Sequence, residues 1–209
     1  MAGADGPRPS KHAQRSQATR AALIEVGRTL FGARGYAAVG TEEIVREAGV
    51  TRGALYHQFR DKRELFEAVV EVVEGDATRR VVEGALARAG DPVAALRAGA
   101  RAFLEVCAEP EVERILLLDA PGVLGWERWR EIGERHGLGA IMTVLRSAID
   151  AGALPEQPVR PLAHLLLGAL DEAALVIARA GDPVAAREEM LTALDRLLLG
   201  GPPNGGAAR

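Results

Sequence analysis

The sequence predicts an all-α protein, and three observations carry this prediction. Aromatic residues make up only 4% of the 209 residues, while Ala, Leu, Val and Arg dominate, a composition that favours helix–helix packing over a sheet. Apolar residues recur with a helical period, and no segment has a clear period of two. Gly, Pro and capping residues divide the chain into segments of helix length. Because 48% of the residues are hydrophobic, the chain can bury a sizeable core.

The boundary residues divide the chain into about nine helices between two tails. We expect helices at residues 11–34, 41–48, 51–58, 61–88, 92–108, 110–119, 122–151, 158–180 and 183–199. Residues 1–10 and 200–209 are rich in Gly and Pro, which indicates disordered tails. Between the tails we expect a small domain at residues 11–62 and a larger one at residues 63–199.

Turn and cap residues justify the first helices in order. The first helix places Leu23 and Leu30 on one stripe, and Gly35 after it suits a left-handed cap. The second begins at Thr41, whose hydroxyl can accept a hydrogen bond from a free backbone N–H of the first turn. It ends at Gly49, which can adopt the positive φ of a tight turn before the third helix.

Acidic caps mark the helices that follow. Asp61 precedes the fourth helix and Glu64 comes three residues later, as in a capping box. The order Ala-Gly-Asp-Pro-Val-Ala-Ala occurs at residues 89–95 and again at residues 180–186. Gly ends one helix, Asp caps the next, and Pro stands where a missing N–H costs nothing. An internal repeat is the other interpretation, but the sequences that follow diverge, so shared boundary chemistry explains both copies.

Two later boundaries are less regular. Proline residues mark breaks around the sixth helix, at Pro110 and Pro121. The seventh helix contains Gly133, Gly137 and Gly139, so we expect it to be bent or split.

Residues 41–59 have the pattern of a helix-turn-helix. Apolar residues such as Ile44, Leu55 and Phe59 are spaced to face one another and the first helix. The opposite face of the second short helix carries donors and flat rings of the kind that contact phosphates and base edges in a major groove. These residues are Thr51, Arg52, Gly53, Tyr56 and His57. Lys62, at the start of the next helix, could hold a phosphate. Ordinary packing of a helix pair is the alternative interpretation.

The charge distribution favours the DNA interpretation. The net charge is −3, but residues 1–63 contain 11 Lys and Arg against 6 Asp and Glu, a net charge of +5. The remaining residues contain 15 basic and 23 acidic residues, a net charge of −8. A basic third on an acidic body is typical of a polyanion-binding module attached to a different domain. Chance clustering on a solvated face would give the same count.

The residue types and spacing over residues 15–66 resemble the N-terminal domain of the tetracycline-repressor (TetR) family. The matching positions are Phe31, Gly35, Tyr36, Thr41, Ile44, Ala48, Gly49, Val50, Thr51, Gly53, Leu55, Tyr56, Phe59, Lys62 and Leu65. The resemblance implies an all-α homodimer with an N-terminal three-helix DNA-binding domain and a C-terminal domain that dimerises and senses a small molecule. It adds Thr41 to the DNA-contacting set of Thr51, Arg52, Gly53, Tyr56, His57 and Lys62. Many members carry further basic residues in this helix, whereas Arg52 is the one charged residue between Thr51 and Phe59.

The last two helices carry more Leu and Met than one internal contact requires. Two such hairpins, related by a two-fold axis, would form a four-helix dimer interface. We expect the interface to contain Leu162, Leu166, Leu170, Met190, Leu194 and Leu197. A monomer that hides these faces internally is the alternative.

Candidates for a ligand pocket lie on four of the central helices. They are Phe103, Cys107, Leu117, Trp126, Trp129, His136 and Asp171. Each could equally be core packing, and Asp171 could bind a cationic effector or satisfy a neighbouring polar group. Because the set is mostly apolar, a hydrophobic or aromatic effector is expected.

Several function classes are disfavoured. The four His residues are scattered without metal-ligand spacing, there is no phosphate loop or Gly-x-Ser-x-Gly elbow, and Cys107 lies mid-helix among apolar residues. We therefore expect no metal, no cofactor and no enzyme, a helical enzyme being a remote alternative. The sequence contains no run of about 18 apolar residues, so we expect no membrane-spanning helix. We also expect no secretory signal, and the single Cys cannot form an intrachain disulfide.

The sequence thus predicts a cytoplasmic, nucleoid-associated homodimer that binds double-stranded operator DNA. The expected function is a transcriptional regulator, a repressor released from a palindromic operator by an unidentified small molecule. The alternative is a DNA-binding regulator without a small-molecule effector, controlled by a protein partner.

Overall fold

The structure, a computed structural model, describes residues 10–88 and 90–199. In these ranges every regular element is a helix. The elements are α1 (Lys11–Arg34), α2 (Thr41–Glu47), α3 (Arg52–Gln58), α4 (Lys62–Leu86), α5 (Pro92–Cys107), α6 (Pro110–Val112), the π-helical segment η1 (Glu113–Asp119), α7 (Ala120–Leu124), α8 (Trp126–Asp150), α9 (Val159–Ala178) and α10 (Pro183–Leu199). The tails expected at residues 1–10 and 200–209 lie outside the described residues, except for Ser10, which caps α1 by accepting a hydrogen bond from Ala13 N.

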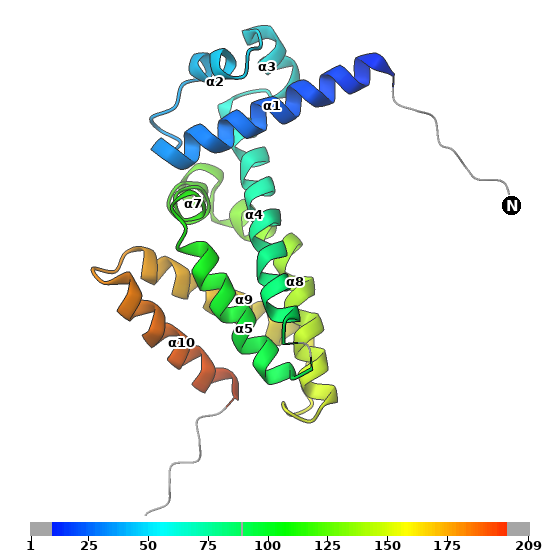
Figure 1. The fold of residues 1–209 in the computed structure, drawn as a ribbon, viewed down its shortest axis with the longest axis vertical. Coiled ribbons are helices and arrows are strands. Elements are labelled where there is room, and N and C mark those ends of the chain that lie inside the picture. The colour runs from blue at the N-terminus through cyan, green and yellow to red at the C-terminus, as the bar shows by residue number, and fades with distance from the viewer. Residues whose placement is uncertain (1–9, 89, 200–209) are drawn as a thin grey trace, which may run out of the picture.

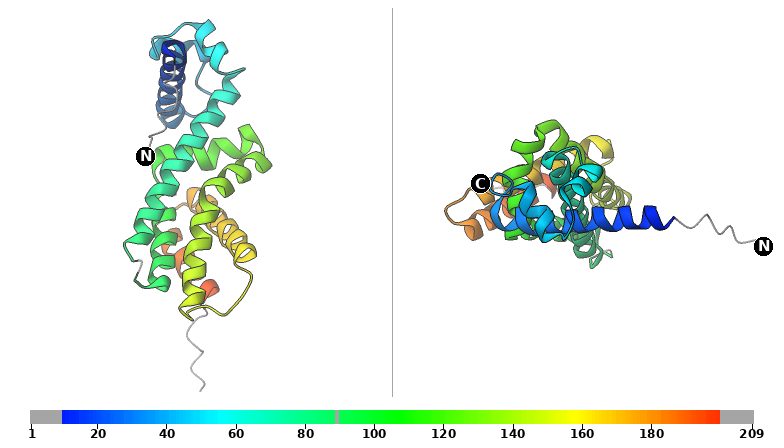
Figure 2. Two further views of the ribbon diagram at one scale, coloured as in Figure 1. Left: turned by 90° about the vertical axis from the view of Figure 1, so that its right-hand side faces the viewer. Right: turned by 90° about the horizontal axis from the view of Figure 1, so that it is seen from above.

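The molecule is elongated, with α1, α2 and α3 gathered at one end (Figure 1). The long helix α4 runs from this end into the larger bundle of α5, α8, α9 and α10, as both side views show (Figures 1 and 2). The amino-terminal half of α1 projects beyond the rest of the protein (Figure 2, right). One continuous helix, α4, thus connects the two ends of the molecule.

Most of the expected boundaries are confirmed. Gly35 and Gly49 have φ values of 79° and 64°, in the left-handed region that favours glycine. Asp61 accepts from Glu64 N at 2.8 Å. Asp91 and Asp182 each accept from the backbone N–H groups two and three residues on. The Asp caps of the two similar heptapeptides are therefore confirmed, whereas the helices before them end three to four residues ahead of Gly90 and Gly181.

The predicted cap at Thr41 is wrong. Thr41 is the first residue of α2, the N-cap is Gly40, and no side chain caps this end. The capping box at α4 also differs, because Glu64 accepts from Arg60 N at 2.6 Å, one residue before the cap.

The break expected near Pro121 is displaced. Residues 110–124 are helical throughout, and the break falls at Gly125, where φ is 84°. Pro121 cannot donate a backbone hydrogen bond, and its ring crowds the preceding turn of an α-helix. The wider π-helical turns of η1 come directly before it and accommodate this defect. The next helix, α8, starts at Trp126 and continues without interruption past Gly133, Gly137 and Gly139.

A continuous apolar core links the two ends of the molecule. Around α1, α3 and the start of α4, Phe31, Phe59 and Phe66 are fully buried, and the rings of Phe31 and Phe66 meet edge to face at 5.2 Å. In the larger domain α9 is the most apolar helix, and by length and composition alone it could cross a membrane. It packs here against α8, α10 and α5, and nine of its residues are buried in the bundle.

Candidate DNA interface and effector cavity

Helix α3 turns its apolar residues inward and its polar residues outward. Leu55 is fully buried and Phe59 is 1% exposed. Thr51 caps the helix by accepting from Ala54 N at 3.2 Å. Gln58 Nε2 donates to Ser16 Oγ at 2.8 Å, which ties α3 to α1. The orientation of α3 relative to α1 is therefore fixed by packing and by this hydrogen bond.

The outer face of α3 is free to meet a partner. Arg52, Tyr56 and His57 are exposed, and Tyr56 is 44% exposed despite its large ring. The Arg52 guanidinium lies 5.6 Å from the centre of the Tyr56 ring and 3.5 Å from a Glu42 carboxylate oxygen. An exposed ion pair of this kind is worth at most about 1 kcal/mol, so Arg52 can exchange Glu42 for a phosphate or a base at little cost.

Gly53 and Thr41 fit this surface in different ways. A side chain at Gly53 would meet only Thr51 Oγ1, 3.9 Å away, so the protein's own packing does not require glycine there. A bare backbone at this position lets α3 approach a partner closely. Thr41 is half-buried and lies at the start of α2, not on α3.

Lys62 occupies an internal position that differs from the expected phosphate contact. Its ammonium donates to the carbonyl oxygens of Tyr36 and Val39, both at 3.0 Å. It also lies 3.9 Å from the centre of the Tyr36 ring. Burial lowers the pKa of Lys62. The side chain therefore holds the segment between α1 and α2, and its charge is already used within the domain.

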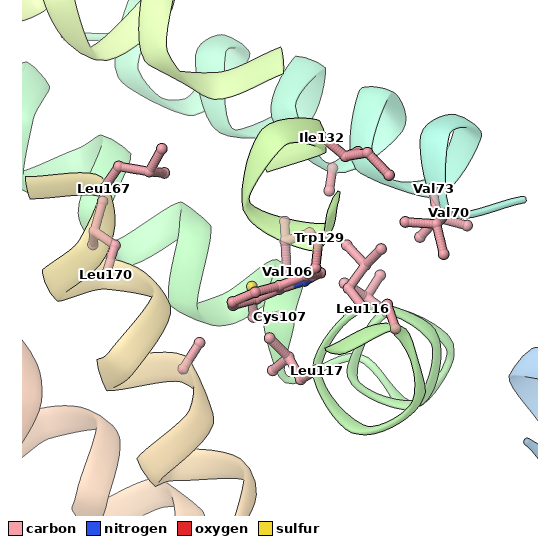
Figure 3. Close-up of a cluster of buried hydrophobic side chains, with 14 of the residues drawn as sticks. Val70, Val73, Val106, Cys107, Leu116, Leu117, Trp129, Ile132, Leu167 and Leu170 are labelled. Atoms are coloured by element: carbon pink, nitrogen blue, oxygen red, sulfur yellow. The ribbon is translucent and has the colours of Figure 1, made fainter. Parts of the chain in front are cut away.

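A cavity of about 310 Å³ lies in the larger domain, among α4, α5, η1, α8 and α9. Five of the predicted pocket residues line it: Phe103, Cys107, Leu117, Trp129 and Asp171. Figure 3 shows Trp129 of α8 beside Val106 and Cys107 of α5, with Leu116 and Leu117 of η1 below and Leu167 and Leu170 of α9 opposite. The apolar lining can hold a ring or an alkyl chain.

The other two predicted pocket residues lie elsewhere. Trp126 is 56% exposed and packs against Trp129, with ring centres 4.8 Å apart and ring planes tilted by 50°. His136 Nε2 lies 2.8 Å from a Glu71 carboxylate oxygen, in an ion-pair network between α4 and α8. Neither side chain lines the cavity.

Three charged residues line the cavity among apolar neighbours. Arg130 pairs with Asp171, and burial nevertheless raises the pKa of Asp171 to about 6. Glu74, which sequence reasoning missed, has its pKa raised to about 7, first by burial and then by the charges of Asp171 and Glu71. Burial also raises the pKa of the Cys107 thiol, so Cys107 is a poor nucleophile.

Polar contacts connect the cavity wall to the DNA-binding domain. Leu116 and Leu117 of η1 line the cavity, and the flanking Glu111 and Asp119 contact α1 and the residue after Gly35. Arg28 of α1 holds Glu111 through two hydrogen bonds, at 3.0 and 2.8 Å. Asp119 accepts from Tyr36 N at 2.6 Å.

The Arg28 contact reaches a second helix. Its guanidinium also meets Asp76 of α4 at 2.7 Å, so α1, α4 and α6 converge on one side chain. Sequence reasoning missed Arg28 because its partners lie 48 and 83 residues away.

The outer surface of α9 and α10 corrects the expected dimer interface. Leu166, Leu170 and Leu194 are 5–6% exposed and pack inside the protomer, so they leave little surface for a second copy. Leu162 and Met190 are half-buried, and Leu197 is 74% exposed. The exposed stripe on α9 instead contains Leu165 and Val176, which are 72% and 38% exposed. Apolar side chains still face outward on both helices.

Comparisons with known proteins agree with this architecture. Residues 23–69 match the family model of tetR-family bacterial regulatory proteins, and residues 93–201 match the model of a tetracyclin repressor-like C-terminal domain. AcrR, an HTH-type transcriptional regulator of Shigella flexneri, is 35% identical over 107 residues, which cover 51% of this chain and half of AcrR. TtgR of Pseudomonas putida is 41% identical over 58 residues, 28% of each chain.

Solved structures extend the likeness over the whole chain. A TetR-family regulator from Pectobacterium atrosepticum is 34% identical, with a TM-score of 0.79, over 93% of this chain and all of that one. RolR, solved with resorcinol, shares the fold at 21% identity and a TM-score of 0.72, over 89% of this chain and 90% of RolR. The C-terminal match alone spans half of the sequence, and the match to the Pectobacterium protein spans nearly all of it. The chain therefore belongs to the TetR family of bacterial transcriptional regulators.

Proposed function

We propose that this protein is a homodimeric, cytoplasmic repressor that binds a palindromic operator through α3 and leaves it when a small molecule enters the cavity. The observation that carries the proposal is the outer face of α3. It combines one exposed guanidinium, an exposed phenol ring and an exposed imidazole on a helix whose inner face is fixed in the core. Such donors on a rigid helix suit a DNA major groove.

Within this proposal Thr51, Arg52, Tyr56 and His57 contact DNA, and Gly53 permits the close approach. Thr41 contributes from the adjacent end of α2. Lys62 has a supporting role, because its ammonium already bonds two carbonyl oxygens. Arg52 is the charged residue of α3 and is expected to contribute most to base recognition.

Dimerisation follows from the apolar residues that α9 and α10 leave exposed. Leu165, Val176 and Leu197 have no partner within the protomer that covers them, and a second copy related by a two-fold axis would bury all three. The dimer would hold two α3 helices about 34–36 Å apart, one turn of DNA.

The cavity favours a small-molecule effector over a protein partner, because it is a concave space lined by five helical elements and is mostly apolar. A ligand that displaces Leu116 or Leu117 would move η1, and with it Glu111 and Asp119, which hold α1 and the start of the segment after it. The ligand would shift the population away from the DNA-binding spacing if it binds the other state more tightly.

Fluorescence anisotropy with a labelled duplex and sedimentation velocity test the proposal together. We expect a dimer, with affinity for double-stranded DNA that falls steeply as salt rises because phosphate contacts release counterions. Arg52→Ala should weaken binding and leave the dimer intact. A monomer that ignores DNA at low ionic strength would contradict the proposal.

A further inference from the structure

Glu74 is the charged group of the cavity without a polar partner in the described part of the chain. The other two charged groups, Arg130 and Asp171, form an ion pair with each other. No hydrogen bond or ion pair joins Glu74 to a described residue. Glu71, one helical turn earlier on α4, by contrast forms ion pairs with Arg128, Arg135 and His136. A carboxyl group in an apolar cavity is costly to ionise unless something donates to it.

The groups around Glu74 supply no cation that could neutralise it. Asp171 of α9 and Glu71 of α4 are both acidic and both disfavour its ionisation. Cys107 of α5 is neutral because burial raises the pKa of its thiol. Arg130 of α8 is held by Asp171, and it also lies 3.4 Å from Glu134. The charged lining therefore carries one more acid than base when Glu74 is ionised.

The rest of the lining favours the apolar part of a ligand. Trp129 and Phe103 offer flat rings, and the aliphatic residues include Val81, Leu96, Ile141 and Leu167. A volume of about 310 Å³ lies at the lower end of the roughly 300–1,000 Å³ that hold drug-sized ligands.

We propose that the cavity selects lipophilic cations: a ring or alkyl body fills the apolar space while a protonated amine donates to the Glu74 carboxylate. This inference rests on the proposed function in that it assigns a chemical class to its effector. A neutral hydroxyl ligand would meet Glu74 in its protonated form, and a carboxylate ligand would face Glu74 and Asp171 as like charges.

The sign of the pH dependence separates these classes. A cation binds the ionised form of Glu74, so binding releases the proton that Glu74 holds below pH 7. The affinity for a cation should therefore rise roughly tenfold from pH 6 to pH 8 and then level off. The affinity for a neutral ligand such as an alcohol should not increase as the pH rises.

Isothermal titration calorimetry of the full-length protein with three probes of one skeleton tests the proposal. The probes are 6-phenylhexylamine, 6-phenylhexan-1-ol and 6-phenylhexanoate. We expect the amine to bind most tightly and to gain affinity with pH. In Glu74→Gln, amine binding should fall about tenfold or more and lose its pH dependence, because a charge-assisted hydrogen bond is worth about 1.5–3 kcal/mol. Glu83→Gln, at an exposed pair on the same helix, should behave as the parent does.

Three results would overturn the proposal: equal affinity for the alcohol, an amine affinity that Glu74→Gln leaves unchanged, or no binding of any probe. The pH profile of the parent protein provides a test even if Glu74→Gln fails to fold. DNA binding is measured separately with no probe present. A protein that binds DNA but prefers the alcohol would therefore refute the cation inference and leave the proposed function standing.

Discussion

Replacing Lys62 with Met separates a structural role from a phosphate contact. Met keeps an unbranched apolar stem but removes the ammonium, which donates to two carbonyl oxygens at 3.0 Å and lies over the Tyr36 ring. A hydrogen bond from a charged donor contributes about 1.5–3 kcal/mol, and Lys62 is only half-buried, which reduces each contribution. We expect Lys62→Met to lower the free energy of unfolding by about 2–4 kcal/mol.

The matched control is Arg52→Met, on the exposed face of α3. Arg52 makes one exposed ion pair, so its replacement should change the free energy of unfolding by less than about 0.5 kcal/mol. Its replacement should instead reduce the slope of log affinity against log salt by up to about 2, because the dimer loses one charged DNA contact from each protomer. Lys62→Met should leave that slope unchanged.

Urea unfolding followed by circular dichroism gives the stabilities, and anisotropy at several KCl concentrations gives the slopes at a temperature where both variants remain folded. The reasoning is refuted if Lys62→Met keeps the parent stability while its salt slope falls by about 2, one phosphate contact from each protomer. That result would mean that the ammonium reaches a phosphate instead of the carbonyl oxygens.

Three further predictions concern the larger domain. Leu197→Glu, at a 74% exposed position, should shift the protein towards monomer in sedimentation velocity. The control Leu118→Glu, at a 40% exposed position on η1, should leave the dimer intact. If both variants remain dimers, the interface lies elsewhere. The pKa of Glu74 is raised from 4.5 to about 7 in the folded protein, so its contribution to the free energy of unfolding is complete below pH 4.5 and is lost, by at most about 3 kcal/mol, as the pH rises to 7. Glu74→Gln should remove this part of the pH dependence in urea unfolding. Parallel pH profiles for the parent and the variant would contradict the prediction. Gly133→Ala should raise the free energy of unfolding by about 0.5–1 kcal/mol, since a Cβ there meets nothing within 4 Å and α8 is helical on both sides; a loss of stability would mean that the backbone needs glycine.

Local chemistry made much of the fold predictable. Asp91 and Asp182 cap their helices through their own side chains, and Gly49 adopts the positive φ that the turn between α2 and α3 uses. The inner face of α3 followed from the spacing of Leu55 and Phe59. These features depend on residues within a few positions of one another, which a sequence displays directly.

Features that depend on distant partners were not predictable in the same way. Lys62 was expected to face a phosphate because nothing nearby in sequence indicated the carbonyl oxygens of Tyr36 and Val39. Helix α9 carries Leu on adjacent stripes, so its period did not tell whether Leu165 or Leu166 faces outward. Glu74 did leave a signal, since it interrupts the apolar stripe that contains Val70 and Ala77 of α4.

The central claim is that two copies of α3 bind one duplex as a symmetric pair. Binding-site selection with the purified protein and a random duplex library tests it most directly. The account predicts enrichment of an inverted repeat whose half-sites are centred about one helical turn apart, or a multiple of it. Enrichment of a single asymmetric site, or no enrichment at low ionic strength, would contradict it.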